Sequence, residues 1–226
     1  MATRRRDGIA ATLAILAALV TGAWGIARAE AAGLPDPALD APLAKGPGQD
    51  SIVVAGGCFW GVQAVFQHVR GVTRAVAGYA GGAAATAQYE MVSTGTTGHA
   101  ESVQVTYDPS QVTPGQILKV YFAVAHDPTE VDRQGPDQGT QYRSEIFFST
   151  AGQQKIADAY IAQLDQAKVF ARPIATKVEP LKGFYQAEAY HQNYARLHPY
   201  DLYIVINDQP KVAALERDFP QLYVTP

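Results

Sequence analysis

The stretch "SIVVAGGCFWGVQAVF", residues 51–66, predicts a strand, a sharp turn and a helix in direct succession. Its first five residues are a short run of mostly β-branched side chains, which is typical of a buried strand. Two glycines end the run. Large apolar residues then recur at the spacing of one helix face, at Phe59, Val62, Phe66 and Val69. A helix is therefore expected to begin at or just after Cys58, the one cysteine of the chain.

The rest of the chain continues this interleaving of strands and helices. Strands are expected in "TRAVAGYAGG" (73–82), "HAESVQVTYDP" (99–109), the segment 142–148, "IATKV" (174–178) and "DLYIVI" (201–206). Helices are expected after Thr113-Pro114, after Thr150 with its capping partner Gln153, and at 188–196 and 210–219. Such a pattern predicts an α/β or α+β fold in which helices pack on a sheet.

The N-terminus has the features of an export signal. Three arginines, residues 4–6, precede an apolar run, and small residues follow in "ARAEAAG". This order predicts a secretory signal peptide over 1–29 and an exported protein, periplasmic or secreted. An uncleaved membrane anchor is the alternative, because the apolar run is just long enough to cross a bilayer. A flexible, proline-rich leader is expected over 30–50, and one folded domain over 51–226.

Composition excludes several classes of function. The formal charge is −3, and no basic cluster interleaved with aromatic residues appears, so a nucleic-acid partner is not expected. One cysteine cannot form an internal disulfide, and the residue three positions after it is Gly61, which excludes a CxxC redox pair. Five scattered histidines show no metal-ligand spacing, so no metal site is expected.

Cys58 is the first candidate catalytic residue. Unpaired N–H groups and the dipole at a helix N-terminus favour an anion, which predicts a lowered thiol pKa and a nucleophilic sulfur. A buried cysteine that packs as a small hydrophobe is the competing interpretation. The next two residues, Phe59 and Trp60, are adjacent and cannot share one helix face. At least one of these rings is therefore expected near the surface beside the thiol.

Glu101 is the second candidate. Strand alternation puts it on the same side as Val103, Val105 and Tyr107, toward the core. Burial penalises a charged carboxylate and raises its pKa, and a carboxyl group that stays protonated at neutral pH suits general acid catalysis. A glutamate at a strand end that reaches solvent is the alternative interpretation.

Two other functions are compatible with these residues. A cysteine hydrolase or acyltransferase would need a histidine beside Cys58, and the candidates are His99, His191 and His198. A binding module with an aromatic pocket is the non-enzymatic alternative, and its function would tolerate the loss of the thiol.

Five motifs make the chain resemble the A-type peptide methionine sulfoxide reductases from about residue 51 to 198. They are "GGCFWG" (56–61), "GYAGG" (78–82), "GTTGHAE" (95–101), "HDP" (126–128) and "GPDQGTQYRS" (135–144). The resemblance implies a compact two-layer α/β sandwich, with helices packed on a mixed β-sheet. It also implies reduction of methionine sulfoxide, free or in proteins, with preference for the S epimer at sulfur.

The resemblance assigns a role to each matching residue. Cys58 matches the cysteine that attacks the sulfoxide sulfur, and Glu101 matches the acid that protonates the sulfoxide oxygen. Tyr89 and Tyr142 match two tyrosines whose hydroxyls assist at that oxygen. Further matches are the substrate-binding aromatic pair Phe59 and Trp60, and Asp137, an aspartate that shapes the site.

The resemblance also implies how the enzyme is regenerated. The family uses no cofactor, and many members carry additional cysteines in a Gly-rich C-terminal tail that resolve the cysteine sulfenic acid. This tail has none. We therefore expect a monomeric enzyme for the repair of oxidised proteins that depends on an external reductant. That reductant is a thioredoxin-like or glutaredoxin-like protein, or a small thiol.

Overall fold

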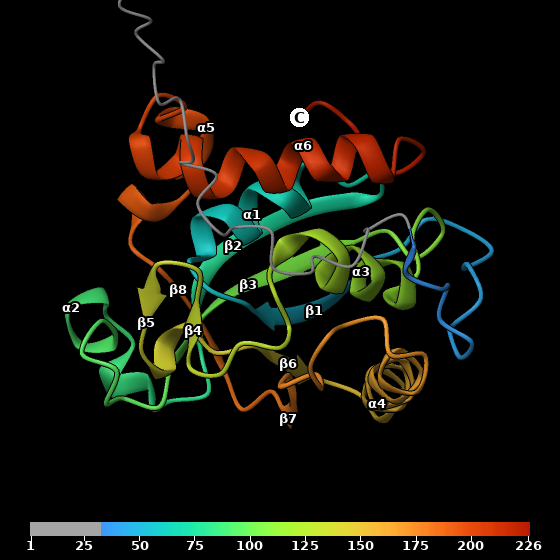
Figure 1. The fold of residues 1–226 in the computed structure, drawn as a ribbon, viewed down its shortest axis with the longest axis horizontal. Helices are drawn as coiled ribbons and strands as arrows, with labels where there is room; N and C mark the ends of the chain where they lie inside the picture. The colour runs from blue at the N-terminus through green and yellow to red at the C-terminus, as the bar shows by residue number, and fades with distance from the viewer. Residues whose placement is uncertain (1–32) are drawn as a thin grey trace, which may run out of the picture.

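A six-stranded mixed sheet forms the centre of the protein (Figure 1). The computed structural model describes residues 33–226, so the predicted signal peptide lies outside the described residues. The strands are β1 (Asp50–Ala55), β2 (Val72–Ala80), β3 (Ala100–Tyr107), β4 (Arg133–Gln134), β5 (Asp137–Gln138), β6 (Glu145–Phe148), β7 (Lys177–Pro180) and β8 (Phe184–Gln186). The main sheet has the order β7-β6-β1-β3-β2-β8, in which β6 and β7 are parallel and the other neighbours are antiparallel; β4 and β5 form a separate hairpin.

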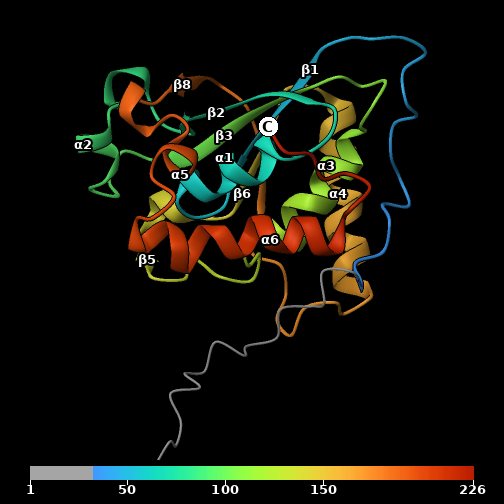
Figure 2. The same cartoon turned by 90° about the horizontal axis from the view of Figure 1, so that it is seen from above.

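Helices cover the sheet and gather at two ends of the molecule. The α-helices are α1 (Phe59–Gln67), α2 (Tyr89–Val92), α3 (Pro114–Val120), α4 (Ala151–Gln166), α5 (Tyr194–Leu197) and α6 (Gln209–Asp218). Single turns of other helical types lie at η2 (Ala84–Thr86), η3 (Tyr121–Ala125), η4 (Thr140–Tyr142), η5 (Ala189–His191) and η6 (Ile204–Asp208). α1 lies between the sheet and α6, and in both views α2 and α5 lie at one end while α3 and α4 lie toward the other (Figures 1 and 2). The predicted mixed sheet with packed helices is confirmed.

The turn between β1 and α1 requires its glycines. Gly57 has a φ of +85°, in the left-handed region that favours glycine, and a Cβ there would overlap the side chain of Gln134. The chain therefore turns sharply at the end of a central strand. Cys58 follows as the N-cap of α1, as the sequence predicts.

Strand alternation sorts the core into two layers. The β1 residues Ile52 and Val54 face the main core with α1, α3 and α4, while Val53 faces a small second cluster on the other side of the sheet. On β3, Val103, Val105 and Tyr107 all belong to the main core. Glu101 shares their parity and is 3% exposed, so its predicted inward direction is confirmed.

The predicted leader is an extended segment that makes specific contacts. Leu34 is buried in the main core, and Tyr160 on α4 donates a hydrogen bond to the carbonyl of Pro35. Asp40 accepts hydrogen bonds from the Thr113 hydroxyl and the Gly115 N–H at the start of α3. Residues 34–40 thus pack on α3 and α4, which the proline-rich composition did not predict.

Two predictions of local structure are wrong. The segment 201–206 is helical rather than a strand, because Ile204 and Asp208 are buried one helical turn apart while Val205 and Ile206 are exposed. Tyr142 lies in the turn η4 and not on the strand that begins at Glu145. The short edge strand β8 was not predicted. None of the helices within the described residues is long and apolar enough to cross a membrane.

Candidate active site

Cys58 lies where the end of β1, the start of α1 and the start of β3 meet. The cysteine is only 9% exposed, and its φ of −56° and ψ of 123° place its backbone outside the helical conformation, just before the first residue of α1. The N–H of the next residue, Phe59, donates a hydrogen bond of 3.1 Å to Oε2 of Glu101. The first free N–H of the helix therefore holds the carboxyl group next to the thiol, so the two predicted catalytic residues lie together.

The thiol pKa differs from the sequence-based expectation. Burial raises the pKa of the Cys58 thiol well above its ordinary value, and the nearby carboxyl groups of Glu101 and Asp208 raise it further. The Trp60 N–H at the helix N-terminus and the Lys211 ammonium act in the opposite direction but are weaker. The expected lowering by the helix N-terminus is thus present and is outweighed, so the resting sulfur is a protonated thiol.

Glu101 has the electrostatic properties of an acid that works at neutral pH. Burial raises its pKa to about 8; the Phe59 N–H lowers that pKa, and Asp137 and Asp208 raise it. Below this value the carboxyl group is mostly protonated. It is therefore able to give a proton to a ligand beside Cys58 without first taking one from solvent.

Tyr89 and Tyr142 reach the same site from two different elements, the helix α2 and the turn η4. Tyr89 is the first residue of α2, and its N–H donates a 3.0 Å hydrogen bond to Glu188. Tyr142 ends the turn η4. Burial raises the pKa of each phenol, and the charges of Glu101 and Cys58 add to both shifts. Both hydroxyls are therefore neutral hydrogen-bond donors close to the thiol and the acid.

Phe59 and Trp60 point to different surroundings, as the helical spacing predicts. Phe59 is fully buried, with its ring near Tyr79 and His191. Trp60 is half-buried and stacks on Tyr194, with ring centroids 3.8 Å apart and an interplanar angle of 10°. Its indole N–H donates to Nδ1 of His191 at 3.2 Å. Both rings nevertheless lie near His191, in the first turn of the helix that follows Cys58.

Asp137 joins the site through a residue that sequence analysis missed. Tyr203 donates a 2.5 Å hydrogen bond to Oδ2 of Asp137, and its ring meets Trp60 edge to face. Burial raises the pKa of Asp137, whereas the Tyr203 hydroxyl and Lys211 lower it. Tyr203 lies in "DLYIVI", which the sequence analysis interpreted as a strand. A short apolar run of this kind fits either a strand or a helix, so no local signal in the sequence placed Tyr203 beside α1.

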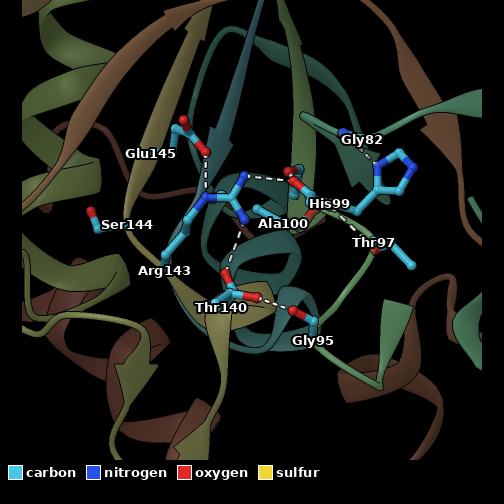
Figure 3. A network of polar contacts seen from close by, with 12 residues as sticks. Gly82, Gly95, Thr97, His99, Ala100, Thr140, Arg143, Ser144 and Glu145 are labelled. Carbon is cyan, nitrogen blue, oxygen red and sulfur yellow. Dashed lines mark hydrogen bonds and ion pairs between the residues drawn. The ribbon is translucent and has the colours of Figure 1, made fainter. Parts of the chain in front are cut away.

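A network around Arg143 holds the loops that carry these residues (Figure 3). Arg143 donates to Glu145 at 2.7 Å, to the Thr140 carbonyl at 2.9 Å and to the Gly98 carbonyl at 3.0 Å. Thr140 in turn donates to the carbonyl of Gly95 at 2.6 Å. The loop that precedes Glu101 and the turn that bears Tyr142 are therefore connected directly by hydrogen bonds.

The histidines do not form a hydrolase site. Within the described residues no hydrogen bond joins Cys58 to a histidine; His99 bonds the backbone of residues 82 and 83, and His191 bonds Trp60. His126 is buried, bonds Ser144 at 2.7 Å, and burial lowers its pKa to about 3, so it stays neutral. No group of three or more potential ligands in residues 33–226 could hold a metal ion.

The sequence is similar to those of known proteins. A family profile described as "Peptide methionine sulfoxide reductase" matches residues 50–222. The chain is 60% identical over 177 residues to a peptide methionine sulfoxide reductase MsrA of Mesorhizobium japonicum, which covers 78% of this chain and 91% of the relative. It is 48% identical over 192 residues to a protein of the same name from Synechocystis, with coverage of 84% and 88%.

Solved structures share the fold. The reduced form of Mxr1 from Saccharomyces cerevisiae superposes with a TM-score of 0.61 at 32% identity, covering 70% of this chain and 94% of that one. Methionine sulfoxide reductase A of Corynebacterium diphtheriae superposes with a TM-score of 0.58 at 37% identity, covering 69% and 77%.

Proposed function

The chain belongs to the peptide methionine sulfoxide reductase family, and from this premise we propose that it reduces the S epimer of methionine sulfoxide, free or in proteins, through Cys58. The observation that carries the proposal is the buried carboxyl group of Glu101 beside the one cysteine of the chain. Glu101 and Cys58 meet at the first turn of α1, where the Phe59 N–H fixes the carboxyl. A nucleophile and an acid are the two groups that the reaction requires.

The reaction balances with the residues present. The Cys58 sulfur attacks the sulfoxide sulfur while Glu101 gives its proton to the sulfoxide oxygen. The S–O bond of the substrate breaks, the oxygen passes to Cys58 as a sulfenic acid, and methionine leaves as the thioether. The proton that the thiol loses restores Glu101. The sulfoxide is thereby reduced by two electrons, and the cysteine is oxidised by two.

The surrounding residues support this step in distinct ways. The neutral hydroxyls of Tyr89 and Tyr142 donate hydrogen bonds to the sulfoxide oxygen as negative charge grows on it. Phe59 and Trp60 provide an apolar surface for the S-methyl group. Asp137 shapes the site by holding Tyr203 against Trp60.

Regeneration depends on an external thiol. The chain contains one cysteine, so an internal disulfide is impossible. The sulfenic acid therefore forms a mixed disulfide with an incoming thiol, and a second thiol releases Cys58. The reductant is a thioredoxin-like or glutaredoxin-like protein, or a small thiol.

The protein acts as a monomer in repair of oxidised proteins outside the cytoplasm, after removal of residues 1–29. The intact mass of the protein from its native host tests the export proposal.

A peptide assay tests the proposed activity. Incubation of the protein with dithiothreitol and a peptide that carries either the S or the R sulfoxide should remove one oxygen from the S peptide only. Mass spectrometry measures the loss. Removal of oxygen from neither peptide would contradict the activity, and equal removal from both would contradict the proposed preference. The binding-module alternative predicts retained peptide binding with no loss of oxygen.

A further inference from the structure

A buried ion pair lies beside the first turn of α1. Asp208 ends η6 and Lys211 lies in the first turn of α6, with Nζ 3.1 Å from Oδ1. Asp208 is fully buried, and the side chain of Lys211 is 12% exposed. Within residues 33–226, the second carboxyl oxygen of Asp208, Oδ2, has no hydrogen-bond partner. A buried carboxyl group with a free oxygen is costly, so its position calls for a function.

Gly61 allows the pair to approach Cys58. It is the third residue of α1, and a Cβ there would overlap Asp208 and lie 2.8 Å from Nζ of Lys211. Any larger residue would push the pair away from the helix. Because Cys58 is the N-cap of the same turn, both charges act on its sulfur: Asp208 raises the thiol pKa and Lys211 lowers it.

The charged groups that face the sulfur come from three elements. Glu101 lies on β3, Asp208 on η6 and Lys211 on α6. Four phenols also interact with it, at Tyr89, Tyr142, Tyr194 and Tyr203. At neutral pH Glu101 is mostly protonated, since its pKa is about 8. Asp208 and Lys211 therefore supply one charge of each sign near the thiol.

We propose that Asp208 and Lys211 are positioning residues that act through Cys58: the buried pair, which lies against the first turn of α1 at Gly61, sets the electrostatic environment of the sulfur, and its ammonium group stabilises the anionic sulfur during attack. The inference rests on the proposed role of Cys58 as the nucleophile. Protonation at rest suits a site with a single cysteine, because peroxide oxidises thiolates and further oxidation to sulfinic acid is irreversible. The Asp208 carboxyl group, together with burial and Glu101, favours that protonated state.

The pH dependence of Cys58 alkylation tests this assignment. Iodoacetamide labelling, followed by intact mass, reports on Cys58 alone because no other cysteine exists. Asp208→Asn removes the negative charge and keeps the shape, so labelling at pH 8 should become about tenfold faster and the pH profile of labelling should move to lower pH. Asp208→Asn with Lys211→Met removes both charges and should label more slowly than Asp208→Asn but faster than the unmodified protein. Glu216→Gln, an exposed residue on the same helix, should label at the unmodified rate.

The order of the three rates separates an electrostatic role from a structural one. If the pair has only a structural role, the labelling rate of the double variant should differ from the unmodified rate at least as much as that of Asp208→Asn does. This result would overturn the proposal. A folded Asp208→Asn protein that labels at the unmodified rate would also overturn it. If Asp208→Asn does not fold, the double variant is compared with the unmodified protein, because it leaves no unpaired buried charge. Faster labelling of the double variant supports the proposal, and equal or slower labelling overturns it. Alkylation needs no sulfoxide, so this result is independent of whether the proposed reaction occurs.

Discussion

Cys58→Ser is expected to abolish sulfoxide reduction completely. The sulfur is the atom that accepts the oxygen, and a serine hydroxyl is a far poorer nucleophile that cannot form a sulfenic acid. The peptide assay with dithiothreitol should show no loss of oxygen above the rate without protein. Substantial activity in this variant would exclude Cys58 as the nucleophile and revive the binding-module or a different catalytic interpretation.

The same substitution should leave the fold intact. Cys58 is the N-cap of α1 and makes no side-chain capping hydrogen bond, whereas serine is a preferred N-cap residue. A capping hydroxyl is worth ~0.5–2 kcal/mol, so the thermal midpoint of Cys58→Ser should equal or exceed that of the unmodified protein. Loss of activity together with an unchanged or raised midpoint assigns the effect to chemistry rather than to unfolding.

Glu101→Gln has the second largest expected effect. The amide keeps the shape of the carboxyl group and its oxygen can still accept the hydrogen bond from the Phe59 N–H. It cannot deliver a proton as the S–O bond breaks. The single-turnover rate should therefore fall by about 10²–10⁴-fold, the usual contribution of general acid catalysis, with a much smaller change in substrate binding.

The pH profile provides a second measurement of this role. A carboxyl group with a pKa of about 8 is protonated below that pH and loses its proton above it. The single-turnover rate should therefore decline as the pH rises through about 8, and Glu101→Gln should lack this decline. Glu179→Gln, on an exposed position of β7, is the matched control and should keep both rate and profile. An unchanged rate in Glu101→Gln would remove Glu101 from the acid role.

The sequence predicted the elements whose pattern is local. The strand, glycine turn and helix around Cys58 follow from a β-branched run, two glycines and helical spacing. The inward direction of Glu101 follows from strand alternation. The segment 201–206 was ambiguous because a short apolar run fits either a strand or a helix. Its helical form depends on packing against α1, which no local pattern encodes.

The electrostatics of the site were less predictable. The helix N-terminus suggested a lowered thiol pKa, but burial and two carboxyl groups raise it. One of those groups, Asp208, lies 150 residues from Cys58 in the sequence and comes near it through the contact of η6 with α1 at Gly61. Tyr203 and His191 were missed as partners of Trp60 for the same reason. Their place depends on tertiary packing.

A single turnover without any thiol tests the central claim most directly. The protein is mixed with excess S-sulfoxide peptide and dimedone, a reagent that traps sulfenic acids, and both products are measured by mass. We predict one equivalent of reduced peptide for each protein molecule and one dimedone adduct, located at Cys58. Repeated turnover in the absence of thiol, or reduction without an adduct at Cys58, would contradict the proposal that one cysteine accepts the oxygen and waits for an external reductant.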